Sequence, residues 1–211
     1  MINYLVIEGN IGAGKTSLAS MIAEKHNARL ILEQYADNPF LPKFYRDPNR
    51  YSFPLELSFL AARYNQLHKE LTSPDLFQPL TVADYFFSKS LIFAKITLQI
   101  DEFNLYRQLF DIIHQQLPKP DLYVYLYVSI EKLVSNIRKR GRDYEQDIKP
   151  DYLERVQQGY FEYLRSLQDQ KIIVLDMEHL DFIYVKRHYS LIEDAIFHQK
   201  HVVGMNRIQL P

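Results

Sequence analysis

Short apolar runs alternate along the chain with longer segments whose apolar residues recur every three or four positions. The short runs predict buried parallel strands at residues 3–8, 29–33, 80–84, 122–128 and 172–175. The longer segments predict helices, among them one that begins after residue 15 and two with apolar stripes over residues 103–117 and 153–167. Alternating strands and helices predict an α/β protein with a five-stranded parallel sheet flanked by helices.

Residues 34–53 interrupt this alternation. They contain Pro39, Pro42 and Pro48 among many aromatic side chains, and proline removes a backbone donor from regular structure. We expect an ordered loop with short helical turns that lines a pocket. No internal repeat or linker is visible, so a single domain over residues 1–211 is expected.

Composition is that of an ordinary globular protein, with 47% hydrophobic and 24% charged residues. A formal charge of -1 does not provide the broad basic surface typical of nucleic-acid-binding proteins. No apolar run approaches the ~18 residues of a membrane span, and the N-terminus lacks a basic segment followed by an apolar one. The absence of cysteine excludes disulfides and thiolate metal sites. We therefore expect a cytoplasmic protein with no nucleic-acid partner and no membrane.

The segment GNIGAGKT, at residues 9–16, follows the first predicted strand and has the spacing of a P-loop. Its glycines permit positive φ and a close backbone approach, so that successive N–H groups can face a phosphate at the positive end of the following helix. Lys15 is expected to reach the β- and γ-phosphates, and the Thr16 hydroxyl to ligate Mg²⁺. The predicted ATP-binding residues are Gly9, Asn10, Gly12, Ala13, Gly14, Lys15, Thr16 and Ser17.

A P-loop alone does not name the reaction. The sequence shows no GTPase specificity motif and lacks the length of a motor, so a small-molecule kinase remains. Such an enzyme needs a carboxylate that receives the proton of the acceptor hydroxyl. Glu33 ends the second predicted strand at the sheet edge where the P-loop also opens. We interpret Glu33 as this base, with a solvated or helix-capping glutamate as the alternative.

Four cationic side chains surround Gly141 at the end of a predicted helix. One interpretation is ordinary capping, in which cations and a glycine stabilise the helix C-terminus. The other is a lid over about residues 138–147 that covers the transferring phosphoryl group and excludes water. The lid interpretation makes three arginines catalytic: Arg138, Arg140 and Arg142.

Together these segments resemble the deoxynucleoside kinase family, from Asn3 to about Leu167. GNIGAGKT resembles that family's phosphate loop, LEQYADNPFLPKFY the segment with its catalytic glutamate, and RGRDYEQ its lid. The resemblance implies a P-loop NTPase fold of the nucleoside-kinase type, ATP and Mg²⁺ as cofactors, and a homodimer. It also implies that the γ-phosphoryl group passes to the 5′-hydroxyl of a deoxynucleoside.

The resemblance assigns further residues to the acceptor site. Glu33 takes the role of the base, and Arg140 and Arg142 face the phosphates. The remaining implied contacts are Tyr45 and Glu145 for the sugar 3′-hydroxyl, Arg63 near the base and the 5′ end, and Phe93 stacked on the nucleobase.

Two departures from the family pattern lie near the reacting groups. The family has an acidic residue followed by arginine after its third strand, whereas here Asp84 is followed by Tyr85 and Phe86. We expect Asp84 to hold Mg²⁺ through water, and the missing cation either to lower the rate or to be replaced from the lid. Where the family presents a glutamine and an aspartate to the nucleobase, this chain has Glu56 and Lys89. We expect these two to pair, which leaves the base preference open.

Two other functions fit the same residues. Arg50 and Arg63 suit the grip on an acceptor phosphate that a nucleoside monophosphate kinase of the thymidylate kinase type needs. The missing arginine also suits a catalytically weakened nucleotide-binding module. Deoxynucleoside phosphorylation is the leading interpretation, because the P-loop, Glu33 and the lid cations all retain their chemical roles.

Overall fold

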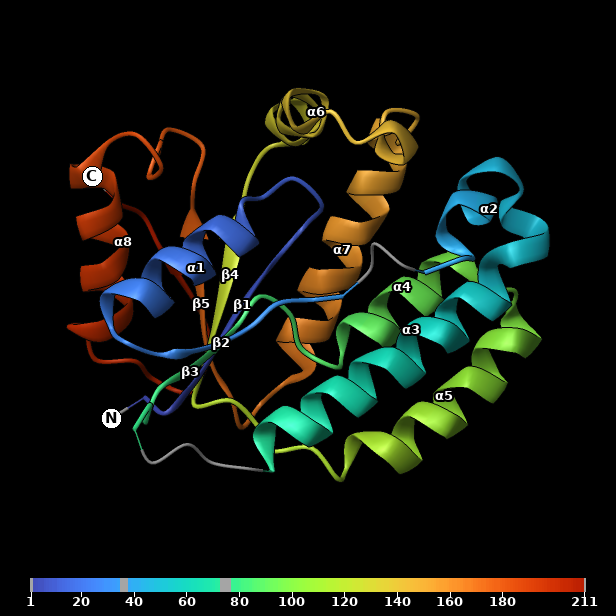
Figure 1. Cartoon of the computed structure of the whole chain (residues 1–211), viewed down its shortest axis with the longest axis horizontal. Helices are drawn as coiled ribbons and strands as arrows, with labels where there is room; N and C mark the ends of the chain where they lie inside the picture. Colours follow the sequence, from blue (N-terminus) through green and yellow to red (C-terminus); the bar gives the residue numbers. More distant parts are fainter. Residues whose placement is uncertain (1, 35–37, 73–76, 211) are drawn as a thin grey trace.

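The computed structural model describes residues 2–34, 38–72 and 77–210, and a parallel sheet forms its centre (Figure 1). The strand order is β2-β3-β1-β4-β5-β6. The six strands are β1 (Tyr4–Gly9), β2 (Arg29–Ile31), β3 (Thr81–Ala83), β4 (Leu122–Tyr127), β5 (Lys171–Asp176) and β6 (Gly204–Ile208). The predicted parallel sheet is confirmed, with six strands rather than five. The sixth was missed because β6 lies at the edge and its sequence, GMNRI, has no apolar run.

Helices cover both faces of the sheet (Figure 1). They are α1 (Lys15–Lys25), α2 (Leu41–Arg46), α3 (Pro48–Leu71), α4 (Lys89–Thr97), α5 (Ile100–His114), α6 (Ile130–Arg140), α7 (Pro150–Ser166) and α8 (Lys186–Phe197), with a short 3-10 helix, η1 (Asp143–Glu145). In the described part of the chain, no helix is both long and apolar enough to cross a membrane.

Two hydrophobic clusters, one on each face, hold the helices to the sheet. Leu5 and Ile7 of β1 join the cluster that contains α1 and α8, whereas Tyr4 and Val6 join the cluster that contains α3, α4, α5 and α7. Both faces of the sheet are therefore buried, which explains why the strands read as nearly continuous apolar runs.

The proline-rich segment is a loop only in part. The short helix α2 occupies residues 41–46, as the expected helical turns suggested, but the long helix α3 already begins at Pro48. Pro48 suits a first helical turn, whose N–H groups have no partner within the helix, and the Asp47 side chain accepts a hydrogen bond from the backbone N–H of Arg50 at 3.4 Å. The loop prediction was therefore wrong for residues 48–53. Residues 35–37 of the segment lie outside the described residues.

Candidate active site

The P-loop joins β1 to α1 and depends on glycine at two positions. Gly12 and Gly14 have φ of 84° and 89°, in the left-handed region that glycine adopts without strain. A Cβ atom at Gly12 would lie 3.0 Å from the carbonyl oxygen of Leu133 in α6, and one at Gly14 would lie 3.1 Å from the Phe182 ring. Backbone conformation and close packing therefore both require these glycines.

Lys15 lies at the start of α1, where its Nζ donates hydrogen bonds to the carbonyls of Gly9 and Asn10, each at 2.9 Å. Burial, together with repulsion from Lys89, lowers the pKa of Lys15 to about 8. The side chain of Asn10 does not face a cavity, because its amide donates to the Leu153 carbonyl of α7 at 2.8 Å. Asn10 thus anchors the loop to α7, and its carbonyl holds Lys15.

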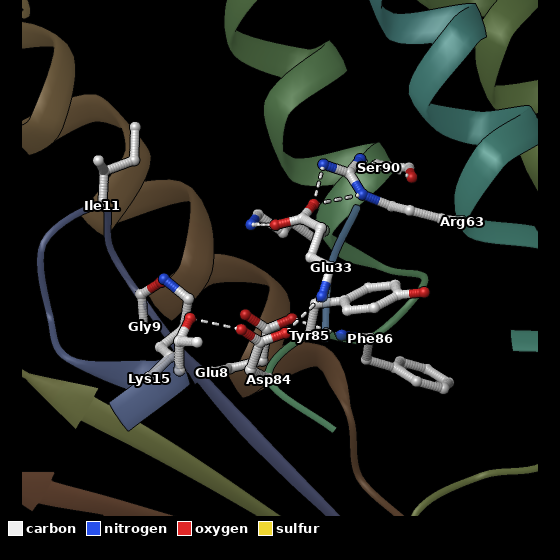
Figure 2. A network of polar contacts seen from close by, with 12 residues as sticks. Glu8, Gly9, Ile11, Lys15, Glu33, Arg63, Asp84, Tyr85, Phe86 and Ser90 are labelled. Carbon is white, nitrogen blue, oxygen red and sulfur yellow. Dashed lines mark hydrogen bonds and ion pairs between the residues drawn. The ribbon is translucent and has the colours of Figure 1, made fainter. Parts of the chain in front are cut away.

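The two predicted metal ligands are in direct contact. The Thr16 hydroxyl donates to Asp84 Oδ2 at 2.6 Å. Asp84 Oδ1 accepts the backbone N–H of Glu33 at 2.8 Å (Figure 2). The described residues contain no group of three or more histidine or carboxylate side chains that could hold a metal ion by themselves. Mg²⁺ usually keeps several waters and binds one or two carboxylates plus substrate phosphates, so a hydroxyl and a carboxylate beside the P-loop fit this ion.

Glu33 lies two residues beyond β2 and is held by two cations. Its Oε1 accepts from Arg63 Nε at 2.9 Å and Nη2 at 2.7 Å, and its Oε2 accepts from Lys89 Nζ. Arg63 is itself fixed by a 2.9 Å hydrogen bond to the Ser90 hydroxyl (Figure 2). Burial alone would raise the pKa of Glu33, but Lys89 and Arg63 outweigh burial and lower this pKa to about 2. The carboxylate is therefore ionised across the neutral range.

The expected pair between Glu56 and Lys89 was wrong. Lys89 begins α4 and binds Glu33, with its ammonium 5.6 Å from the centre of the Phe93 ring. Glu56 instead accepts a hydrogen bond from the Thr97 hydroxyl at 2.9 Å. With Lys89 and Arg63 in contact, the pKa of Glu33 falls to about 2, whereas burial raises the pKa of Glu56 to about 7.

The segment after Asp84 turns into the core instead of supplying a cation. Tyr85, Phe86 and Phe87 are all buried, and the Phe86 N–H donates to Glu8 Oε1 at 2.9 Å. The other oxygen of Glu8 accepts from the Tyr160 hydroxyl at 2.9 Å. Sequence reasoning missed Glu8, although an acidic residue at the end of a buried strand is an available signal. Through these two hydrogen bonds, Glu8 connects the segment after Asp84 to Tyr160 of α7.

A cavity with an empty volume of about 830 Å³, its open mouth included, lies between the P-loop, α3, α4 and the lid. It brings together the predicted acceptor residues Glu33, Tyr45, Glu56, Arg63, Lys89, Phe93 and Glu145. We call it the acceptor cavity.

A second cavity, here called the donor cavity, opens on the other side of the P-loop. It is lined by residues 12–17, by Lys132, Asn136 and Lys139 of α6, and by residues 177–184 after β5. Sequence reasoning missed the last segment, although it follows a predicted strand at the carboxyl edge of the sheet. Five residues line both cavities: Gly12, Lys15, Thr16, Arg140 and Arg142. The two cavities therefore meet at the P-loop and the lid.

The lid arginines differ in their placement. Arg140 and Arg142 both form ion pairs with Glu145, at 3.2 Å for Arg142, and Glu145 is buried in the wall of the acceptor cavity. Arg138 is exposed on α6 and lines neither cavity. The geometry thus groups two of the three predicted arginines with both cavities.

The fold and these adjoining cavities define a P-loop phosphotransferase. A model of the family described as deoxynucleoside kinase matches residues 5–203. The chain belongs to the deoxynucleoside kinase family. It is a deoxynucleoside kinase, an enzyme that transfers a phosphoryl group to a hydroxyl group of its substrate.

Individual relatives agree with this assignment. The chain is 37% identical over 196 residues to a deoxyguanosine kinase of Bacillus subtilis (strain 168), with 90% of this chain and 93% of the relative covered. It is 30% identical to a deoxyadenosine kinase of Lactobacillus acidophilus, with 87% and 89% covered.

Solved structures resemble the whole fold. The structure of deoxyadenosine kinase from M. mycoides with bound dCTP superposes with a TM-score of 0.79 at 25% identity, covering 93% of this chain and 100% of that one. A second structure of that enzyme, with the products dCMP and dCDP bound, gives 0.80 at 26% identity over the same shares.

Proposed function

We propose that the deoxynucleoside lies in the acceptor cavity with its 5′-hydroxyl at Glu33, and that ATP lies in the donor cavity with its phosphates on the P-loop. The observation that carries this proposal is the Glu33 carboxylate, held by Arg63 and Lys89 beside the Thr16–Asp84 contact. That arrangement supports transfer of the γ-phosphoryl group from ATP in the donor cavity to the deoxynucleoside in the acceptor cavity.

Glu33 orients the nucleophile in this scheme. A carboxylate has about four acceptor sites, and Arg63 and Lys89 use three of them, so one remains for the 5′-hydroxyl. The hydroxyl oxygen attacks the γ-phosphorus, the bond from that phosphorus to the β-phosphate oxygen breaks, and ADP leaves. Since the pKa of Glu33 is about 2 in the free enzyme, Glu33 receives the proton late, as a loose transition state allows.

Lys89 replaces the cation that the segment after Asp84 does not supply. Its ammonium contacts Glu33 from the first turn of α4, and Arg63 contacts the other carboxylate oxygen. These cations keep Glu33 ionised and favour negative charge on the attacking oxygen.

The lid and the cavity wall complete the proposed site. Arg140 and Arg142 break their ion pairs with Glu145 and cover the transferring phosphoryl group. Glu145 is then free to bind the sugar 3′-hydroxyl. Tyr45 shares that hydroxyl, and Phe93 stacks on the nucleobase. Arg138 has no support for a catalytic role, because it is exposed outside both cavities.

Thr16 and Asp84 hold Mg²⁺ in this proposal, and the ion neutralises charge on the β- and γ-phosphates. Asp84→Asn should raise the Mg²⁺ concentration for half-maximal rate by about tenfold or more, because the amide keeps an oxygen for the Glu33 N–H but loses the negative charge. Titration of the rate with Mg²⁺ at fixed ATP measures this. Asp121→Asn is the matched control, since Asp121 binds the backbone N–H groups of Asn3 and Tyr4 and lines neither cavity. An unchanged Mg²⁺ requirement in Asp84→Asn contradicts the assignment.

The lowered pKa of Lys15 predicts that the enzyme binds MgATP less well at alkaline pH. As pH rises through about 8, Lys15 of the free enzyme loses its charge, so kcat/KM for MgATP should fall. The value of kcat at saturating MgATP should fall less, because bound phosphates hold the proton on Lys15. Steady-state rates measured across this range test the prediction, and a kcat/KM that stays level above pH 8 contradicts it.

An analogue that lacks the acceptor oxygen tests the reaction itself. A deoxynucleoside should release one ADP for each nucleotide product, whereas the matching 5′-deoxy analogue should release none and should compete with the deoxynucleoside. Equal ADP release with both compounds would contradict transfer to the 5′-hydroxyl.

We also propose that the whole chain acts as one kinase domain, in the cytoplasm, as a homodimer. Apolar side chains that α5 leaves exposed support a surface for a second copy: Ile100, Leu105, Leu109 and Ile112. Light scattering should give twice the chain mass of 25.1 kDa, and a monomer at all concentrations would contradict the dimer.

A further inference from the structure

Glu56 is a buried carboxyl group in the wall of the acceptor cavity. It lies on α3 with 2% of its surface exposed, and the Tyr106 hydroxyl contacts its backbone carbonyl at 3.3 Å. The Thr97 hydroxyl, one turn beyond Phe93 on α4, donates to its Oε1 at 2.9 Å. Its Oε2 has no hydrogen-bond partner among the residues that the structure describes. A bound ligand is therefore the natural partner of Oε2, since buried polar atoms are nearly always paired.

We propose that Glu56 selects the nucleobase through its protonation state, with the ionised form favouring guanine and the neutral form favouring adenine. This inference rests on the proposed placement of the nucleoside in the acceptor cavity. It extends that placement to the choice of base.

The two purines differ where Oε2 would meet them. On its pairing edge guanine offers two adjacent donors, N1–H and the amino group at C2, and an ionised carboxylate only accepts. Adenine instead places a ring acceptor, N1, beside its amino group. A neutral carboxyl group matches that pattern, because its O–H donates to the ring nitrogen while its other oxygen accepts from the amino group. The same side chain therefore fits each purine in one protonation state.

The surroundings of Glu56 allow both the ionised and the neutral carboxyl group near neutral pH. Burial raises the pKa of Glu56 to about 7, against the lowering effects of Arg63 and the Thr97 hydrogen bond. The charged and titratable groups that act on it, element by element, are Arg63 on α3, Glu33 after β2, Lys89 on α4, Tyr106 on α5 and Tyr152 on α7. Burial raises the pKa values of both tyrosines, so they stay neutral, and Arg63 and Glu33 keep their charges.

A ratio of rates isolates this effect. We expect kcat/KM for deoxyguanosine, divided by kcat/KM for deoxyadenosine, to rise about tenfold between about pH 6 and about pH 8. Titration of Lys15 and the state of ATP and the lid affect both substrates alike and cancel in the ratio. Neither purine ring changes its own protonation in this range, so a change of the ratio with pH (its slope) is caused by a titrating group of the protein.

Glu56→Gln is the decisive variant, because an amide keeps the shape but offers one donor and one acceptor at every pH. Its ratio should be independent of pH and, at about pH 8, about tenfold lower than in the unmodified enzyme. The matched control is Glu193→Gln, which removes another buried carboxylate that pairs with Lys25 and lines neither cavity. This control should keep the full slope.

The outcomes separate this inference from the proposed function. A level ratio in the unmodified enzyme, or a slope that persists in Glu56→Gln, overturns the role of Glu56 while the kinase reaction stands. Phosphorylation of pyrimidine deoxynucleosides alone does the same. An enzyme that phosphorylates no deoxynucleoside overturns both.

Discussion

Replacement of Glu33 by glutamine is expected to lower kcat by about 10²–10⁴-fold while MgATP binding is retained. The amide cannot receive the proton of the 5′-hydroxyl, and it presents an N–H group where the carboxylate presents an acceptor. ATP binding should survive because Glu33 lines the acceptor cavity and not the donor cavity. Single-turnover rates and ATP titration by calorimetry measure the two effects separately.

The same substitution leaves two buried cations without their counter-charge. Arg63 and Lys89 both pair with Glu33, and removal of one partner of a buried ion pair costs about 3–5 kcal/mol of unfolding free energy. Rates must therefore be measured where the variant is shown to be folded. Glu70→Gln is the matched control, because Glu70 pairs with Arg29 outside both cavities, and it should keep normal kcat. A folded Glu33→Gln enzyme with full kcat would contradict the role of Glu33.

Replacement of Lys15 by methionine should lower kcat/KM for MgATP by about 10²–10³-fold. Methionine keeps most of the length of the side chain but removes the positive charge that is proposed to contact the β- and γ-phosphates. The hydrogen bonds from Lys15 to the carbonyls of Gly9 and Asn10 are lost as well, so the loop loses part of its internal support.

A second lysine on α1 provides the control for this variant. Lys25 lies in the last turn of the same helix and pairs with Glu193, away from both cavities. Lys25→Met should leave kcat/KM for MgATP unchanged within about twofold, because the Lys25 side chain is half exposed and lines neither cavity. Equal losses in the two variants would mean that Lys15 acts through the stability of α1 and not through the phosphates.

The sheet and the P-loop were predictable from local sequence. Both faces of the sheet are buried, so its central strands are short apolar runs, and the P-loop has a fixed spacing because the phosphates require it. The edge strand β6 and the first turns of α3 were not predictable in this way. The residues of β6 are only partly buried, and prolines at the start of α3 resemble loop residues although Pro48 suits a first helical turn.

Residue types at the site were predictable, but their pairing was not. Lys89 lies 56 positions from Glu33 in the sequence, and only the parallel sheet brings the ends of β2 and β3 together. Both carboxyl groups are buried, but Lys89 and Arg63 contact Glu33 and lower its pKa, whereas Glu56 accepts from Thr97 and burial raises its pKa. Periodicity and motif spacing carry no information about which carboxyl group a cation distant in the sequence will contact.

Identification of the product tests the central claim most directly. Purified protein with MgATP and each of the four natural deoxynucleosides should yield the 5′-monophosphate of at least one, with the phosphate position assigned from phosphorus–proton coupling at C5′. Absence of any 5′-monophosphate, or a phosphate only at the 3′ position, would contradict transfer from the donor cavity to a 5′-hydroxyl held at Glu33.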